Sequence, residues 1–129
     1  MRDPVGWPAL LAWKDSREAQ RAAAAALPLL RHASKVHVLE VCGRGTEDAA
    51  IRTADVVAWL DRHGIAAEAH VRARGPVTVA RDIVEFAESR KAGLIVSGGY
   101  GHTRLREWAL GGVTRELLAS APVSVLMSH

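Results

Sequence analysis

The stretch LIVSGGYGHTRLREWALGGVT, residues 94–114, carries the strongest structural signal in the chain. It opens with three large aliphatic residues, as expected for a strand that is buried on both faces of a parallel sheet. Three glycines follow within four positions: Gly98, Gly99 and Gly101. Glycine allows positive φ angles and a close approach of the backbone to a ligand. A second pair, Gly111-Gly112, leads directly into an amphipathic helical pattern. This order predicts an α/β fold with a binding loop.

Strand and helix patterns alternate through the rest of the chain. Apolar or β-branched runs predict strands at 9–13, 36–41, 67–72, 94–96 and 123–127. Helices are predicted from Arg17 to about Arg31, from Thr46 to His63-Gly64, from Thr78 to Gly93, and from Val113 to Ala119. Such strict alternation predicts a parallel sheet with helices on both faces and right-handed crossovers. The strand at 67–72 is expected near an edge of the sheet.

Hydrophobic spacing predicts which faces of two helices meet the sheet. For the second helix the predicted stripe is Ala50, Ala54, Val57 and Leu60. For the third helix it is Val79, Ala80, Ile83, Val84 and Ala87. In the first helix, Pro28 is expected to kink the helix or end it early, because proline lacks the N–H that a helix interior needs.

Composition narrows the class of protein. The 129 residues are 49% hydrophobic and 24% charged, which is typical of one globular domain. The net charge of +3 is spread over scattered lysines and arginines, so we expect no nucleic-acid partner. No apolar run approaches the roughly 18 residues that a membrane span needs, and we expect no membrane partner. One cysteine, Cys42, favours a reducing compartment, and the cytoplasm is the expected location.

The glycine-rich stretch is the predicted binding site. In open parallel sheets, ligands bind beyond the carboxyl ends of the strands, where the strand order reverses. Residues 13–16 and 97–103 both lie just past predicted strand ends. Successive N–H groups in a glycine turn form an anion-binding nest, and a helix N-terminus adds further donors. We therefore favour anion binding over a purely structural connection. The loop does not match the Walker A motif, because it lacks the Gly-Lys-Ser/Thr end. It does not match the dinucleotide fingerprint, because Arg104 occupies the position of the third glycine.

No catalytic or metal-binding set stands out along the chain. Ser16, His102 and Asp15 are present, but their spacing does not imply a triad, which is defined by geometry. Six histidines, at positions 32, 37, 63, 70, 102 and 129, lack the short spacing that is typical of metal ligands. We expect a protein that is not an enzyme and that holds no metal of its own.

Three stretches resemble the universal stress protein family. They are Gly98-x-x-Gly101 followed by nine residues and then Gly111, the segment LAWKDSREA at 11–19, and the segment APVSVLM at 121–127. The resemblance is greatest to the second half of tandem members and covers nearly the whole chain as a single domain, residues 1–129. It implies a five-stranded parallel sheet in the order 3-2-1-4-5, similar to flavodoxin and the adenine nucleotide alpha hydrolases. It also implies a homodimer formed through the last strand, and a stress-response role without a defined reaction.

The resemblance also implies a ligand and its site residues. ATP or AMP is the expected ligand, with Mg²⁺ only alongside the nucleotide. The residues expected at the phosphates are Gly98, Gly99, Gly101, His102, Gly111, Gly112, Val113 and Thr114, and those at the adenosine end are Trp13 and Lys14.

Two positions depart from the family pattern of the nucleotide binders. Lys14 replaces an aspartate that accepts hydrogen bonds, and an ammonium group cannot accept one. Gly112 replaces a serine or threonine, so a hydroxyl donor is lost. These departures favour an alternative function, in which the domain has lost its nucleotide and acts as a dimerising scaffold.

Overall fold

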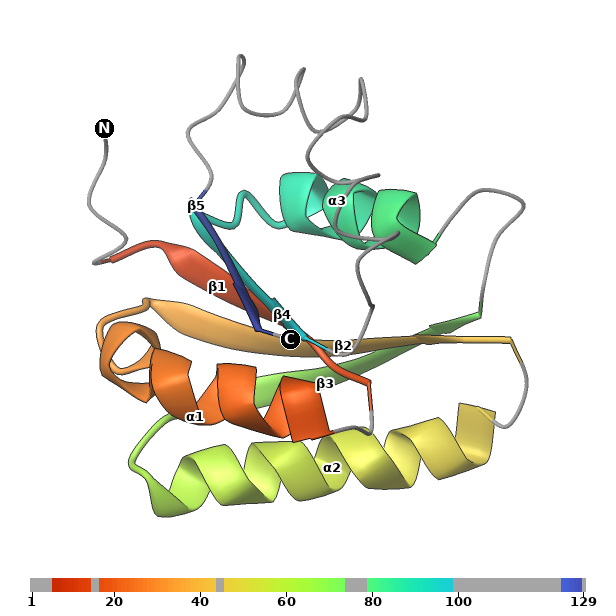
Figure 1. Ribbon diagram of the computed structural model, residues 1–129, viewed down its shortest axis with the longest axis horizontal. Coiled ribbons are helices and arrows are strands. Elements are labelled where there is room, and N and C mark those ends of the chain that lie inside the picture. The colour runs from red at the N-terminus through yellow and green to blue at the C-terminus, as the bar shows by residue number, and fades with distance from the viewer. Residues whose placement is uncertain (1–5, 15–16, 44–45, 74–78, 99–123, 129) are drawn as a thin grey trace.

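The computed structural model of the protein describes residues 6–14, 17–43, 46–73, 79–98 and 124–128 (Figure 1). Strands and helices alternate along the chain as far as β4, as the sequence pattern predicts. In chain order the elements are β1 (Pro8–Ala12), α1 (Arg17–Leu30), β2 (Lys35–Cys42), α2 (Thr46–Arg62), β3 (Ala67–Ala73), α3 (Val79–Ser89), β4 (Leu94–Gly98) and β5 (Ser124–Ser128). The helix predicted at 113–119 lies outside the described residues. None of the described helices is long and apolar enough to cross a membrane.

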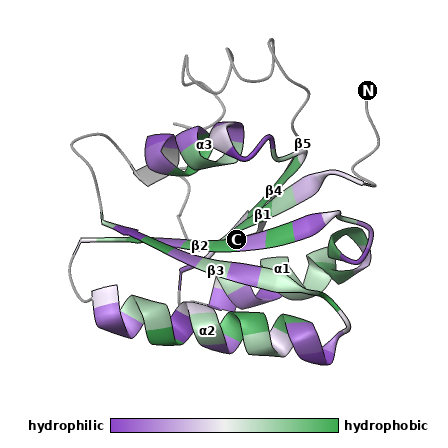
Figure 2. Cartoon of the chain, turned by 180° about the vertical axis from the view of Figure 1, so that it is seen from behind, coloured by the Kyte–Doolittle hydropathy of each residue, from purple (hydrophilic) through white to green (hydrophobic). Residues whose placement is uncertain are grey.

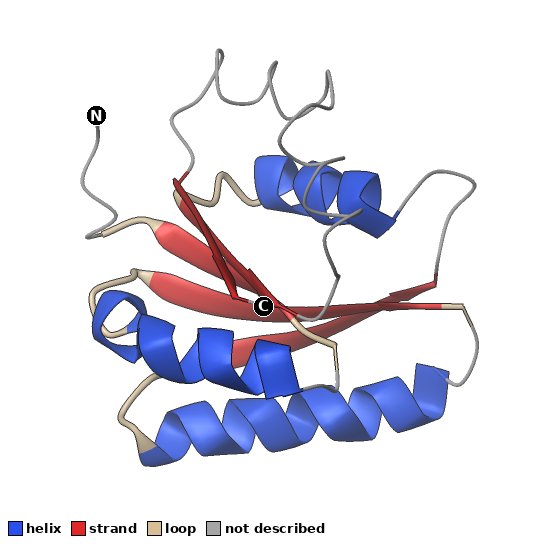
Figure 3. Ribbon diagram, in the orientation of Figure 1, coloured by secondary structure: helices blue, strands red, loops and turns tan. Residues whose placement is uncertain are grey.

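All strands of the sheet run parallel, in the order β3-β2-β1-β4-β5. The α/β fold with a parallel sheet that the sequence predicts is confirmed. The chain builds outward from β1 through β2 to β3, and then returns to the other side of β1 for β4. The strand order therefore reverses between β1 and β4. Helices α1 and α2 cover one face of the sheet and α3 covers the other (Figures 1 and 3).

Two apolar clusters, one on each face, form the core. Leu11 of β1 packs on the α1–α2 side with Val38 and Leu60, and Leu10 packs on the α3 side with Ile83. Neighbouring residues of β1 serve opposite clusters because side chains alternate along a strand. The helices carry both hydrophilic and hydrophobic residues along their length (Figure 2), as expected for helices with one face on a sheet.

The buried stripe of α2 is shifted by one position toward the N-terminus at three of the four predicted residues. Its buried positions are Ala49, Thr53, Val56 and Leu60. Of the predicted residues, Leu60 is confirmed, whereas Ala50 and Ala54 are exposed and Val57 is only half-buried. The prediction was wrong because it left a polar residue out of the core. The Thr53 hydroxyl donates to the carbonyl oxygens of Ala49 at 2.9 Å and Ala50 at 3.1 Å, so it is satisfied inside its own helix.

Helix α1 continues through Pro28 to Leu30, so the expectation that the proline ends it early is wrong. The bond that proline cannot make would go to the carbonyl of Ala24, an exposed residue of the helix. Beyond the proline, the helical hydrogen bonding is present again, with the Arg31 N–H donating to the Leu27 carbonyl at 3.0 Å.

In α3, the predicted residues Ile83, Val84 and Ala87 are buried, and Phe86 is buried with them. The side chains of Val79 and Ala80 lie outside the described residues.

Gly93, just before β4, generates a prediction about stability. A Cβ at this position would lie 2.9 Å from the Cβ and Cε3 atoms of Trp7, which is closer than packed atoms approach. We expect Gly93→Ala to lower the free energy of unfolding by about 1–3 kcal/mol, the usual cost of an overpacked core. Urea denaturation monitored by circular dichroism measures the change. Gly43→Ala is the control, because its added Cβ would meet nothing within 4 Å; equal stability of the two variants would contradict the prediction.

Candidate functional site

The carboxyl ends of β1 and β4 form the edge at which the strand order reverses. Ala12 of β1 is paired with Ser97 of β4, so Trp13 and Lys14 leave one strand beside Gly98, the last residue of the other. The structure thus brings together three of the predicted site residues. The others, which continue the chain after Gly98, lie outside the described residues and remain predictions: Gly99, Gly101, His102, Gly111, Gly112, Val113 and Thr114.

Trp13 and Lys14 differ in their surroundings although they are adjacent. The Trp13 N–H donates to the Leu39 carbonyl at 2.8 Å, which extends the pairing with β2 by one residue. Its side chain is 8% exposed and belongs to the apolar cluster on the α1–α2 face. Lys14 is exposed at the edge of the sheet. The edge therefore combines an anchored aromatic residue with an exposed lysine.

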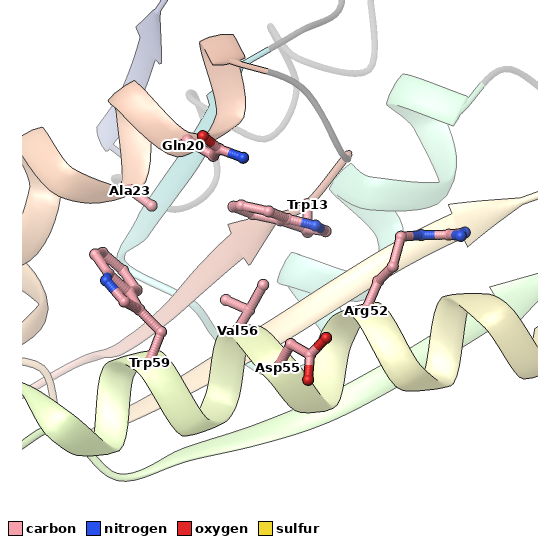
Figure 4. A pocket seen from close by; sticks show the side chains of 7 residues that line it. All are labelled: Trp13, Gln20, Ala23, Arg52, Asp55, Val56 and Trp59. Carbon is pink, nitrogen blue, oxygen red and sulfur yellow. The ribbon is translucent and has the colours of Figure 1, made fainter.

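A cavity of about 400 Å³ opens between α1 and α2 next to Trp13 (Figure 4). Its wall combines two indole rings with a cation, a carboxylate and an amide. The lining residues are Trp13, Gln20, Ala23, Arg52, Asp55, Val56 and Trp59. The sequence pattern does not predict this cavity. Arg52, Val56 and Trp59 are spaced to share one side of α2, but the residues that face them come from α1 and from Trp13, which follows β1.

A buried ion pair fixes the Arg52 side of the cavity. Glu40 of β2 is 8% exposed at its side chain, and both of its carboxylate oxygens accept from Arg52. The Arg52 Nε–H donates to Oε1 at 3.0 Å, and the Nη2 group donates to Oε2. Such bidentate pairing offsets the cost of burying a carboxylate. It also orients the guanidinium group, because two of its donors are held by one carboxylate.

A second group of chemically active side chains lies on the opposite face of the sheet. His37 of β2 and His70 of β3 approach to 2.9 Å between Nδ1 and Nε2, and Glu68 stands next to them. Burial is the main cause that lowers the pKa of each histidine below its ordinary value. Short ligand spacing, the signal used along the sequence, does not predict this group, because His37 is distant in the chain from Glu68 and His70. These donors come from two strands, and the pairing of β2 with β3 brings them together.

Comparison with known proteins places the chain in a family. The model of the universal stress protein family matches residues 8–129. A solved structure of a member from Burkholderia pseudomallei is 22% identical, with 96% of this chain and 98% of that chain covered and a TM-score of 0.66. A universal stress protein from Archaeoglobus fulgidus in complex with dAMP is 24% identical, covers 97% and 99%, and has a TM-score of 0.62. One in complex with cAMP is 22% identical, covers 95% and 96%, and has a TM-score of 0.62. No curated protein sequence matches the chain.

The Glu40–Arg52 pair generates a prediction about the cavity wall. Arg52→Ala would leave the buried Glu40 carboxylate without its bidentate partner. We expect the free energy of unfolding to fall by about 2–3 kcal/mol, less than for a fully buried pair because the Arg52 side chain is 34% exposed. Arg81→Ala is the matched control, since its pair with Glu85 is about half exposed at both ends and should contribute less than about 1 kcal/mol. Chemical denaturation compares the two variants, and losses of equal size would refute the structural role of Arg52.

Proposed function

Because the chain belongs to the universal stress protein family, we propose that it binds a phosphate-bearing ligand at the carboxyl ends of β1 and β4. The observation that carries the proposal is the pairing of Ala12 with Ser97. It sets Gly98, the first residue of the glycine-rich stretch, beside Trp13 and Lys14 at the reversal of strand order. Open parallel sheets bind their ligands at this kind of position.

An adenine nucleotide is the ligand that we propose, with ATP and AMP as the first candidates. Two relatives of the same fold have been solved with dAMP and cAMP, which share an adenine ring and a single phosphate. The phosphates would be held by backbone N–H groups of the glycine stretch, from Gly98 to Thr114, with His102 adding a side-chain donor. Mg²⁺ would bind only together with the nucleotide.

The cavity beside Trp13 favours a binding mode in which different residues hold the ring and the phosphates of the ligand. Lys14 supplies no acceptor, but Asp55 and Gln20 present a carboxylate and an amide oxygen at the cavity wall. Trp13 and Trp59 offer flat apolar surfaces there. We propose that the ring-bearing part of the ligand enters the cavity and that the exposed Lys14 ammonium group meets the phosphates. Lysine is a common phosphate binder as a point charge.

The biological role that we propose is ligand binding in a stress response, carried out by a single domain in the cytoplasm without a catalytic reaction of its own. Family membership supports this role. The free thiol of Cys42 supports a reducing compartment.

Thermal unfolding with and without ligand tests the proposal. A ligand that binds only the folded state raises the unfolding midpoint, by about 2.7 kcal/mol of stabilisation at one hundred times its Kd. We expect ATP or AMP at millimolar concentration to raise the midpoint in wild-type protein at constant ionic strength. Gly101→Val should abolish the rise, because a branched side chain blocks the close approach of phosphate to the backbone.

Two controls separate the glycine stretch from general effects. Gly43→Val changes a glycine that follows β2 at the same edge, and it should keep the response to nucleotide. Lys14→Ala should weaken binding of inorganic pyrophosphate and ATP alike if the ammonium group meets phosphate. The absence of a shift with any nucleotide, in folded wild-type protein, would exclude nucleotide binding.

A second candidate function, a dimerising scaffold, is favoured by the position of β5. This strand pairs with β4 on one side, and no strand pairs with its other side among the residues that the structure describes. An open strand edge offers backbone donors and acceptors to a second chain. A homodimer through β5 is compatible with nucleotide binding. If the protein binds no nucleotide, dimerisation would be its remaining function.

Sedimentation equilibrium tests the homodimer. We expect wild-type protein to sediment as a dimer, and Met127→Lys to weaken dimerisation by about tenfold or more, since an edge-strand lysine opposes strand pairing. Ala24→Lys, at an exposed position of α1, carries the same charge change away from β5 and should leave the dimer intact. Monomeric wild-type protein at the highest soluble concentration would rule out the homodimer.

A further inference from the structure

Three potential metal ligands meet on the sheet face that α3 covers. His37 of β2 is paired in register with Glu68 of β3, and His70 lies two residues further along β3. Because side chains alternate along a strand, Glu68 and His70 project from the same face. The His37 Nδ1 atom lies 2.9 Å from the His70 Nε2 atom, and the Glu68 Oε1 atom lies 3.6 Å from that same nitrogen. No two of the three donor atoms are more than 4.8 Å apart.

These separations approach what a zinc ion requires. Zinc binds imidazole nitrogen and carboxylate oxygen at about 2.0–2.2 Å, so two ligands at a tetrahedral angle lie about 3.4 Å apart. The two shorter separations, 2.9 and 3.6 Å, bracket that value. A rotation of the Glu68 side chain, which is 48% exposed, would shorten the remaining separation, between the donor atoms of His37 and Glu68. Two histidines and one glutamate are a known zinc-ligand set, with water as the fourth ligand.

The protonation states suit metal binding. The pKa of His37 is lowered by burial first and then by the neighbouring His70 and Lys35. The pKa of His70 is lowered by burial, against the opposing effect of Glu68. A lowered pKa favours the neutral form of each ring, which is the form that zinc binds. Without metal, one ring donates its N–H to the other. When zinc binds, that proton moves to the second nitrogen of its own ring, which frees both facing lone pairs.

Neighbouring cations weaken the site without blocking it. The Lys35 ammonium group lies 2.6 Å from Glu68 Oε2, which leaves Oε1 for a metal. The guanidinium groups of Arg72 and Arg90 lie over the Phe86 ring, 5.2 and 5.1 Å from its centre, and all three cationic residues are exposed to water. Water screens such charges strongly. We expect an affinity below that of sites with several carboxylates.

Phe86 of α3 supplies the apolar wall of the site. Its ring centre lies 4.9 Å from that of His70 and 6.1 Å from that of His37. The Glu68 side chain, which is 48% exposed, connects the cluster to solvent. Apolar shells control solvent access to metal sites.

We propose that His37, Glu68 and His70 form a zinc-binding site between β2 and β3. The site belongs to the edge of the sheet, because β3 is its outermost strand. Bound zinc would link this strand to its neighbour through coordination bonds in addition to the backbone ladder. It lies on the opposite face from the cavity, and its test is independent of nucleotide binding.

Zinc titration of the full chain, produced without a histidine tag and freed of metal by a chelator, tests the proposal. We expect one equivalent of Zn²⁺ to bind in competition with a chromophoric indicator, and to raise the midpoint of thermal unfolding. Co²⁺ in place of Zn²⁺ should give the strong visible absorption of a four-coordinate ion.

Substitutions identify the ligands. His70→Gln and Glu68→Gln change the side-chain size little. Each should weaken zinc binding by at least about tenfold. Mutation of a residue that only supports a metal ligand already costs about this much affinity. His63→Gln is the matched control, because His63 packs against Trp59 at the end of α2 and not against the cluster. It should bind zinc as the wild type does. Because His37→Gln alters a buried residue and is prone to misfolding, the two β3 variants are the decisive ones.

Two outcomes would overturn the proposal. One is wild-type protein that binds no Zn²⁺ at concentrations well above those of the protein. The other is unchanged zinc affinity in both His70→Gln and Glu68→Gln, which would assign the metal to other residues, such as Cys42 or His102. Circular dichroism of each variant confirms that it is folded before either result is interpreted.

Discussion

The structure depends on one strand, β1, being enclosed on every side. It pairs with β2 along one edge and β4 along the other, and Leu10 and Leu11 are each only 1% exposed on opposite faces. A five-residue strand that is hydrogen-bonded on both edges and covered by helices on both faces has little freedom to shift. One residue of slippage would exchange the two core clusters, because each side chain would move to the other face.

The rigidity of β1 determines where a ligand site can be built. Its carboxyl end lies at the reversal of strand order, so the loops that leave β1 and β4 begin from a fixed pair of points. Trp13 remains tied to β2 through its N–H, whereas Lys14 is exposed. A binding loop that begins here has a rigid base, which lowers the entropy cost of holding a ligand.

Burying a polar side chain lowers stability unless the side chain is hydrogen-bonded. Among the described residues, no buried side-chain nitrogen or oxygen lacks a hydrogen-bond partner. Glu40 is satisfied by Arg52 on the α2 face, Thr53 by its own helix, and His37 by His70 on the α3 face. These pairs differ in geometry. The Glu40–Arg52 pair uses both carboxylate oxygens and forms part of the cavity wall, whereas the histidine pair is a single hydrogen bond between two rings.

Local sequence determined the elements and their order. Apolar runs and glycine boundaries predict the strands and helices that the structure describes to within a few residues, because hydrophobic periodicity and backbone freedom act over short distances along the chain. The predicted loop beyond Gly98 rests on the same kind of signal and on family resemblance, and it remains a prediction. What tertiary structure decided depends on partners distant in the chain. The cavity needs α1, α2 and Trp13, which follows β1. His37 meets His70 only through the register of two strands. A single sequence encodes these contacts, but their energies depend on distances that exist only after the chain has folded.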